Sequence, residues 1–151
     1  MSDESLRMME LSLEGFGCSQ ITLILGLEAQ GKTNPDLVRA ISGLHGGLGF
    51  SGKVCGALSG GCCLLALYAG RGTPEETEDS RLPLMIQSLV EWFEGEYKKQ
   101  YGGIDCAVIL QGDARNQIAR CPMIVAETFN KVKEILAANN IDFYRAPHVS
   151  A

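Results

Sequence analysis

The sequence predicts an all-α protein: a single-domain bundle of about five to six helices, with a glycine-rich loop before the central helix. Apolar residues recur at three- and four-residue steps over 82–97 and 123–139. Only ITLIL (21–25) and AVIL (107–110) resemble strands, and each fits a helix equally well. A chain of 151 residues suits one domain. We place this domain at 1–140, followed by a C-terminal tail at 141–151.

The first half of the chain contains three predicted helices before its glycine-rich stretch. A helix over 3–14 would have Ser2 as its cap and two acidic residues in its first turn. A second apolar segment covers 18–29. Asn34 and Pro35 form a strong start signal for a third helix, which should end near residue 42.

The second half begins with GLHGGLGFSG (43–52), which we expect to be a loop. The following segment, 53–72, predicts a buried helix whose glycines and alanines let another backbone approach closely. Later elements are a polar loop at 73–80, an amphipathic helix from Leu82, a short apolar piece at 105–110, a loop at 111–117 and a last helix at 123–139. In the amphipathic helix, Trp92 should lie in the core or in a dimer contact.

Composition excludes several functional classes. The net charge is −5, so neither nucleic acid nor an anionic membrane is an expected partner. The N-terminus is acidic and has no signal-peptide pattern, and no apolar run approaches the ~20 residues of a membrane span. These observations predict a cytoplasmic protein.

The segment GLEAQGKT (26–33) matches the phosphate-binding loop pattern G-x-x-x-x-G-K-[ST]. That loop needs a strand before it and a helix that continues directly from its lysine. Here Pro35 follows two residues after Thr33 and disfavours helix at Asn34. We therefore interpret Gly31-Lys32-Thr33 as a surface turn, and keep a P-loop nucleotide hydrolase as a minor alternative.

Six cysteines are more than a reducing cytosol usually leaves without a metal or redox role. Cys18, Cys55, Cys106 and Cys121 each lie at or near a predicted helix start. Helix N-termini favour a thiolate, so we expect lowered thiol pKa values at these positions. Thiolates bind metals and attack disulfides.

Cys62 and Cys63 lie in the middle of the apolar run GGCCLLAL. Their expected role is core packing, although Cys62 shares a helical face with Cys55 and could be an auxiliary thiol. The other four cysteines contain no C-x-x-C pair, which excludes the common zinc-ribbon and bacterial ferredoxin signatures. A site assembled from separate helices remains compatible with their spacing.

Four motifs together resemble the C_GCAxxG_C_C family of redox-active proteins. These motifs are GCSQ (17–20), GLHGGLGFSGKVCGALSG (43–60), DC (105–106) and RCP (120–122). The resemblance covers roughly residues 5–136, and the family's recurrent cysteines correspond to Cys18, Cys55, Cys106 and Cys121. A similar region in split-Soret cytochromes is associated with an iron–sulfur cluster. His45, where the family usually has an aromatic residue, and the Cys62-Cys63 pair depart from the pattern.

The resemblance implies a redox or electron-transfer protein whose four cysteines bind an iron–sulfur cluster, most simply [2Fe-2S]. Gly56 and His45 are candidate cofactor-contacting residues, because the surrounding glycines would let backbone N–H groups approach the sulfurs. Without a cluster, the same thiols would serve thiol–disulfide or sulfur/selenium chemistry, and a structural zinc site is a further alternative. The expected partner is a redox protein or a small sulfur or selenium species, and a homodimer is compatible with the sequence.

Overall fold

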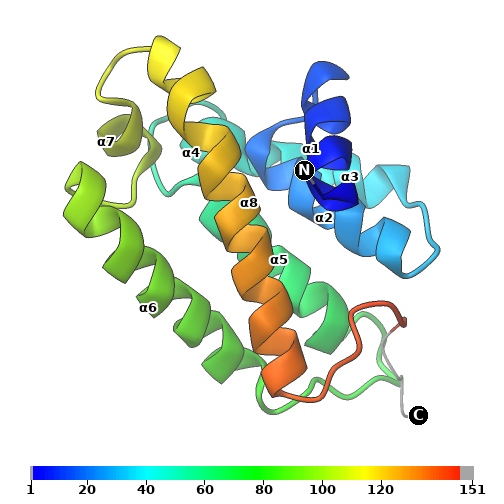
Figure 1. Cartoon of the computed structure of the whole chain (residues 1–151). Helices are drawn as coiled ribbons and strands as arrows, with labels where there is room; N and C mark the ends of the chain where they lie inside the picture. The colour runs from blue at the N-terminus through cyan, green and yellow to red at the C-terminus, as the bar shows by residue number, and fades with distance from the viewer. Residues whose placement is uncertain (1, 147–151) are drawn as a thin grey trace.

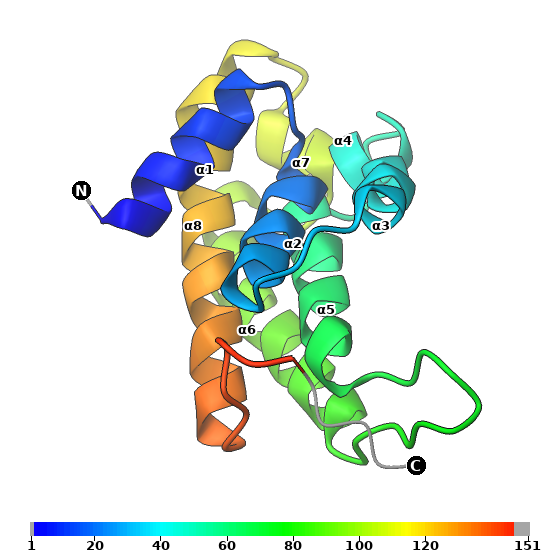
Figure 2. The same ribbon diagram turned by 90° about the vertical axis from the view of Figure 1, so that its right-hand side faces the viewer.

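The computed structural model describes residues 2–146 and is built from helices (Figures 1 and 2). No strand forms within 2–146, where a single isolated β-bridge joins Val54 and Asp105. The all-α prediction is therefore confirmed. The elements are α1 Asp3–Leu13, α2 Cys18–Ala29, α3 Pro35–Ile41, the 3-10 turn η1 Ser42–Leu44, α4 His45–Leu48, α5 Gly56–Ala69, α6 Leu82–Tyr101, α7 Cys106–Leu110 and α8 Arg115–Ala138.

Helix α5 is the centre of the bundle and packs against α2, α6 and α8 (Figure 1). Its own sequence is apolar nearly all round, as expected for a helix with neighbours on several sides. Helix α1 packs on α2, and α3 lies beside α2 over a small second cluster formed by Leu23, Leu27 and Ile41. The main core fills the space between α5, α6 and α8.

Glycine allows α2 and α5 to approach each other closely. A Cβ atom added to Gly60 would lie 2.8 Å from both the Cα and the carbonyl oxygen of Ser19, which belong to the α2 backbone. Gly26 similarly faces the side chain of Leu64. This agrees with the prediction that small residues in the central helix admit another backbone.

The amphipathic faces of α6 and α8 are buried as predicted. In α6 these residues are Leu82, Met85, Leu89, Phe93 and Tyr97. In α8 they are Val125, Thr128, Phe129, Val132, Ile135 and Leu136. Trp92 is partly buried and packs against the main core, with its ring edge-on to Phe93 and Tyr97.

Two predicted helix starts have the expected caps. The Ser2 hydroxyl accepts a hydrogen bond from the Ser5 amide at 3.1 Å, and the Asn34 side chain accepts one from Leu37 at 3.1 Å. Pro35 occupies the first position of α3. Both caps satisfy amides that have no partner within the helix.

The segment GLEAQGKT forms the end of α2 and an exposed turn. Gly31 has a φ of +71°, its amide donates to the Glu28 carbonyl, and the Lys32 amide donates to Leu27. These two bonds are those of a Schellman motif, which ends a helix at a left-handed glycine. The preceding apolar run is helical, so the strand–loop–helix context of a phosphate-binding loop does not occur here.

The last helix starts earlier than predicted. It begins at Arg115 instead of residue 123, and Pro122 lies inside it. The Asp113 carboxylate accepts a bond from the Arg115 amide at 3.0 Å and stabilises this start. Proline lacks an N–H group and removes one bond of the helix, to the carbonyl of Ile118. A lost bond in the second turn does not end a helix whose later turns are well packed.

The glycine-rich stretch is more ordered than a simple loop, since it contains η1 and the short α4. Gly46, Gly47, Gly49 and Gly52 all have positive φ values, and so do Leu48 and Phe50 between them. Helix α5 then begins at Gly56 rather than at residue 53, because Val54 pairs with Asp105 in the isolated bridge.

The segment after α8 is packed as far as it is described. Phe143 is buried, and its carbonyl accepts a 2.6 Å hydrogen bond from the Tyr68 hydroxyl. His148, in the predicted tail, lies outside the described residues. Within residues 2–146, no helix is both long enough and apolar enough to cross a membrane.

Candidate functional site

Cys18, Cys55, Cys106 and Cys121 line one small cavity of about 20 Å³. Four different helices supply them or their flanking positions, so residues far apart in the chain converge here. The remaining lining comes from Gly56, Ala57, Ile109, Leu110, Ile124 and Val125. The four thiols therefore share an otherwise apolar environment. Cys55 is buried, and the other three are partly buried.

Three of the four cysteines lie at helix starts, and one does not. Cys18 is the first residue of α2, Cys55 is the cap of α5, and Cys106 is the first residue of α7. Cys121 was predicted at the cap of the last helix, but it lies in the second turn of α8 because that helix begins at Arg115. It reaches the cavity from the helix face that also carries Ile124 and Val125.

The segment before α5 fixes α7 in place. The Cys106 amide donates to the Lys53 carbonyl at 2.6 Å, and the Ala107 amide donates to Gly52 at 3.1 Å. In return, the Cys55 amide donates to the Ile104 carbonyl at 3.0 Å. These backbone bonds hold Cys55 and Cys106 side by side although 50 residues separate them in the chain.

Gly56 brings the backbone of α5 against the sulfur of Cys18. A Cβ atom at Gly56 would lie 2.5 Å from that sulfur, so any side chain here would displace Cys18. Backbone hydrogen bonds from Gly46, Ser19 and Gly56 favour the thiolate form of Cys18. The glycines thus bring N–H groups to a sulfur, in the way the sequence analysis anticipated for Gly56.

Burial overturns the prediction of lowered thiol pKa values. Desolvation raises the pKa of Cys55 to about 12 and that of Cys121 to about 11, and it also raises the pKa values of Cys18 and Cys106. Electrostatic repulsion between the thiolates adds to this effect. The negative charge of a Cys18 thiolate raises the pKa values of Cys55, Cys106 and Cys121. Helix-start amides act in the opposite direction at Cys18 and Cys55, but they are weaker than the loss of hydration.

His45 lies beside the site without lining the cavity. Its imidazole packs against the backbone of Gly17, directly before Cys18, and its ring centroid is 4.9 Å from that of Phe50. Burial lowers the pKa of His45, which favours the neutral ring. Its position next to Gly17 indicates that His45 supports the start of α2.

Cys62 and Cys63 do not line the cavity. Cys62 packs against the main core, whereas Cys63 packs against the small cluster beneath α3. Burial raises the pKa of both thiols, to about 11 for Cys62. Their positions agree with the predicted role in core packing.

Arg120 is a structural residue of the site that sequence reasoning missed. Its guanidinium donates to the carbonyl of Ile109 in α7 and lies over the ring of Tyr101, 4.9 Å from the centroid. It therefore ties α7, which begins with Cys106, to α8 and the end of α6. The sequence feature that could have indicated this role is the position of Arg120 directly before Cys121.

We expect Arg120→Ala to lower the free energy of unfolding by about 1–3 kcal/mol, because it removes a charged hydrogen bond to a helix-end carbonyl and a cation–π contact. Arg115→Ala is the matched control. Arg115 is 91% exposed and pairs with nearby Asp113, so its loss should change stability by less than about 0.5 kcal/mol. Urea denaturation of both variants measures the difference, and equal midpoints would contradict this role of Arg120.

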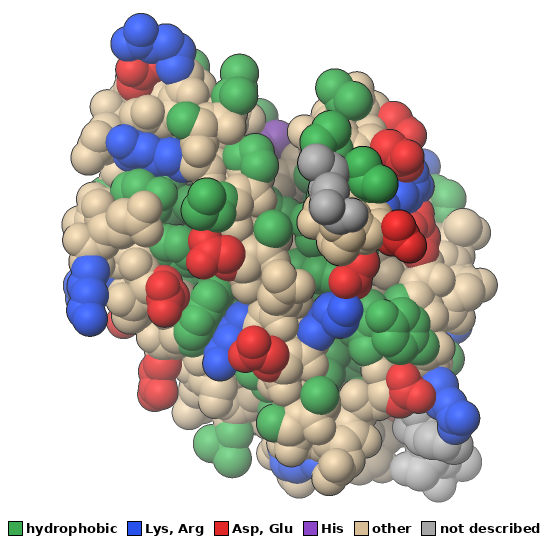
Figure 3. Space-filling view, viewed as in Figure 1, with side chains coloured by type: hydrophobic (Ala, Val, Ile, Leu, Met, Phe, Trp, Pro, Cys, Tyr) green, Lys and Arg blue, Asp and Glu red, His purple; other side chains and the backbone are tan. Residues whose placement is uncertain are grey.

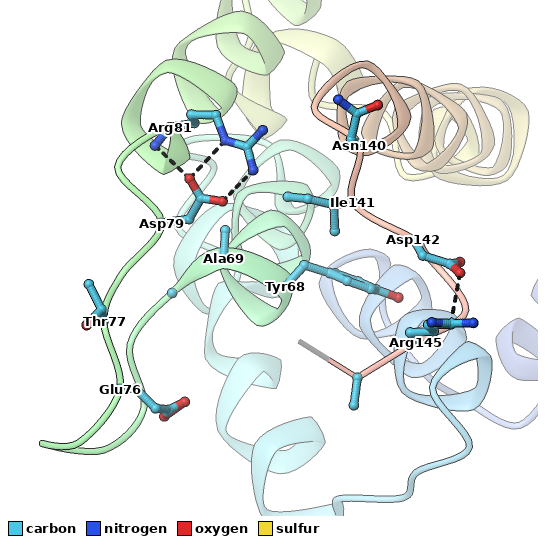
Figure 4. Close-up of a pocket in the computed structure, with 12 residues that line it drawn as sticks. Tyr68, Ala69, Glu76, Thr77, Asp79, Arg81, Asn140, Ile141, Asp142 and Arg145 are labelled. Atoms are coloured by element: carbon cyan, nitrogen blue, oxygen red, sulfur yellow. Dashed lines mark hydrogen bonds and ion pairs between the residues drawn. The ribbon is translucent and has the colours of Figure 1, made fainter. Parts of the chain in front are cut away.

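A larger pocket, of about 370 Å³, lies at the opposite end of α5 (Figure 4). Four of its charged side chains form two ion pairs, Asp79 with Arg81 at 2.7 Å and Asp142 with Arg145 at 3.4 Å, and the Glu76 carboxylate accepts a hydrogen bond from the Gly72 amide at 3.0 Å. None of the four convergent cysteines reaches it. The thiol cavity is thus the place in the described structure where reactive side chains gather.

The thiol cavity contains the side chains of a metal site, but these side chains are too far apart to hold a metal ion in the present arrangement. Four thiols and nearby backbone N–H groups are the donor set that iron–sulfur clusters and zinc use. Within residues 2–146, however, no group of three or more His, Cys, Asp or Glu side chains is arranged closely enough to hold a metal ion. Binding would require the sulfurs to move.

The fold and the site together define an all-helical domain in which four cysteines line one cavity. A family model described as "Putative redox-active protein (C_GCAxxG_C_C)" matches residues 16–135. The chain belongs to this family, and the family description supports a redox role. Searches of curated proteins and of solved structures gave no significant match.

Proposed function

We propose that this protein is an electron-transfer protein whose Cys18, Cys55, Cys106 and Cys121 bind an iron–sulfur cluster, most simply [2Fe-2S]. The observation that carries the proposal is the convergence of these four thiols on one cavity. Four cysteine thiolates are the complete ligand set of such a cluster. The family supports redox activity in general.

The lining of the cavity favours a cluster over disulfide exchange. Apart from the cysteines, it consists of Gly56, Ala57 and aliphatic side chains. Thiols that attack disulfides normally lie in exposed, electropositive surroundings that stabilise the free thiolate. An apolar shell instead suits a bound group that supplies its own positive charge and must be shielded from water.

Each residue of the site would have a distinct role in holding the cluster. The four cysteines would hold the cluster, which would supply a reversible one-electron couple when bound. The backbone N–H groups of Gly46 and Gly56 would stabilise negative charge on the Cys18 sulfur. Ile109, Ile124 and Val125 would exclude water. Arg120 would keep α7 and its cysteine against α8.

Two other uses of the same cysteines compete with this proposal. A dithiol–disulfide cycle would use pairs of the same thiols, such as Cys55 and Cys106. A structural zinc site would use the same four ligands without turnover.

Anaerobic purification followed by visible spectroscopy and metal analysis separates the three. We expect a coloured protein with about two irons and two inorganic sulfides per chain. A colourless, metal-free protein with reversibly oxidised thiols would establish the dithiol alternative. One zinc per chain without colour would establish the structural site.

A further inference from the structure

The surface next to the thiol cavity has a charge opposite to that of the whole chain. The segment 98–121, which covers the end of α6, α7 and the first turns of α8, contains two lysines and two arginines but only two aspartates. The chain as a whole has a net charge of −5. This segment of an acidic protein therefore has a small excess of positive charge, although Arg115 pairs with Asp113, and Lys53 adds a further exposed positive charge beside α7.

Apolar side chains are exposed in the same region. Phe50 is 74% exposed and Ile118 is 84% exposed, and Met123, Leu48 and Val108 are exposed to a smaller extent. Figure 3 shows hydrophobic and basic side chains intermixed over α7 and the first half of α8. Mixed apolar and charged surfaces of this kind are typical of protein interaction sites.

The backbone presents Phe50 outward at a conformational cost. Phe50 and Leu48 both have left-handed φ values, of +63° and +66°, which residues other than glycine rarely adopt. Such strain persists only when the surrounding structure enforces it, and it is concentrated at functional positions. Here backbone bonds within the segment hold it, since the Phe50 amide donates to the His45 carbonyl and the Ser51 amide donates to the Leu48 carbonyl.

This surface adjoins a cysteine of the cavity. The Lys53 carbonyl accepts the amide hydrogen bond of Cys106, Gly52 faces Ala107, and Val108 contacts the Gly103 region. We define the α7 face as Phe50, Lys53, Lys99 and Val108. A partner bound to the α7 face would be separated from the cysteines mainly by the five residues of α7.

We propose that the α7 face is the docking surface for an acidic one-electron carrier protein. This inference rests on the proposed electron-transfer function. Charge complementarity identifies the partner: a basic surface around exposed apolar side chains attracts an acidic protein and repels a second copy presenting the same face. In the exchange, the reduced carrier loses one electron and the cluster held by the four cysteines gains it, or the reverse.

An acidic plant-type ferredoxin serves as the probe, and its association with the purified full-length protein is measured by stopped-flow or surface plasmon resonance at increasing salt. We expect the association rate constant to fall about tenfold or more between low and physiological ionic strength. Lys53→Glu and Lys99→Glu should each lower it several-fold at low salt, and Phe50→Ser should speed dissociation about tenfold. Basic cytochrome c should not bind.

Lys32→Glu is the matched control, since Lys32 is an exposed lysine in the turn after α2, remote from α7. An equal effect of Lys32→Glu and Lys53→Glu would overturn the docking surface, as would preferential binding of cytochrome c or a dimer that Val108→Asp dissociates. Cluster content is recorded for every sample. Salt-dependent ferredoxin binding by a protein without a cluster would overturn the proposed function but support the docking surface. A protein that contains a cluster but does not bind ferredoxin would support the proposed function and overturn the docking surface.

Discussion

Under the proposed function, replacing Cys55 by serine should lower the affinity for the cluster by on the order of 100-fold, because each thiolate would supply roughly a quarter of a large metal-binding free energy. Cys18→Ser, Cys106→Ser and Cys121→Ser should have comparable effects, since all four residues line the same cavity. Iron content and visible absorption of protein purified without oxygen measure the loss.

The remaining two cysteines provide matched controls in the same chain. Cys62→Ala and Cys63→Ala should retain full cluster content and lose only about 1 kcal/mol of stability, because these residues pack against separate hydrophobic clusters away from the cavity. Loss of iron to the same extent in all six variants would contradict the division of the cysteines into four ligands and two packing residues.

The second large effect concerns the contact between α2 and α5. Gly60→Ala should lower the free energy of unfolding by about 1–3 kcal/mol, because its new Cβ would lie 2.8 Å from the backbone of Ser19 and the two helices would have to separate. Cys18 directly precedes Ser19, so the same shift should also disturb the thiol cavity. Thermal denaturation and cluster content report the two consequences.

Gly95→Ala introduces the same methyl group into a different helix. Gly95 lies on the exposed side of α6, and a Cβ atom there would meet nothing within 4 Å. This substitution should therefore stabilise the protein by about 0.5–1 kcal/mol, the difference in helix propensity between alanine and glycine. If both variants change stability in the same direction, the close packing of α2 on α5 is not what requires Gly60.

Most of the fold could be predicted from local sequence patterns. The periodicity of α6 and the Asn34-Pro35 cap are local signals, and the structure reproduces them. The start of α8 could not be placed, because proline usually marks a boundary and the stabilising packing of that helix comes from α5 and α6. Cys121 therefore lies inside α8 and not at its start, as its position before Pro122 had indicated.

The site was only partly predictable. Predicted helix starts and the family resemblance selected the same four cysteines, and the fold brings these four together. The direction of the thiol pKa shifts depends on burial, which the positions of helix starts do not reveal. Arg120 contacts Ile109 and Tyr101 from another helix, so neither contact is visible in the local sequence.

The distribution of the four cysteines over distant helices determines the order of assembly. In a protein with paired C-x-x-C motifs, a metal can bind a short unfolded segment and nucleate structure around itself. Here 36 residues separate Cys18 from Cys55, and Cys106 and Cys121 come still later. Closing such long loops precedes any shared binding site. The bundle must therefore fold first. A cofactor would bind afterwards and stabilise the bundle that has already folded.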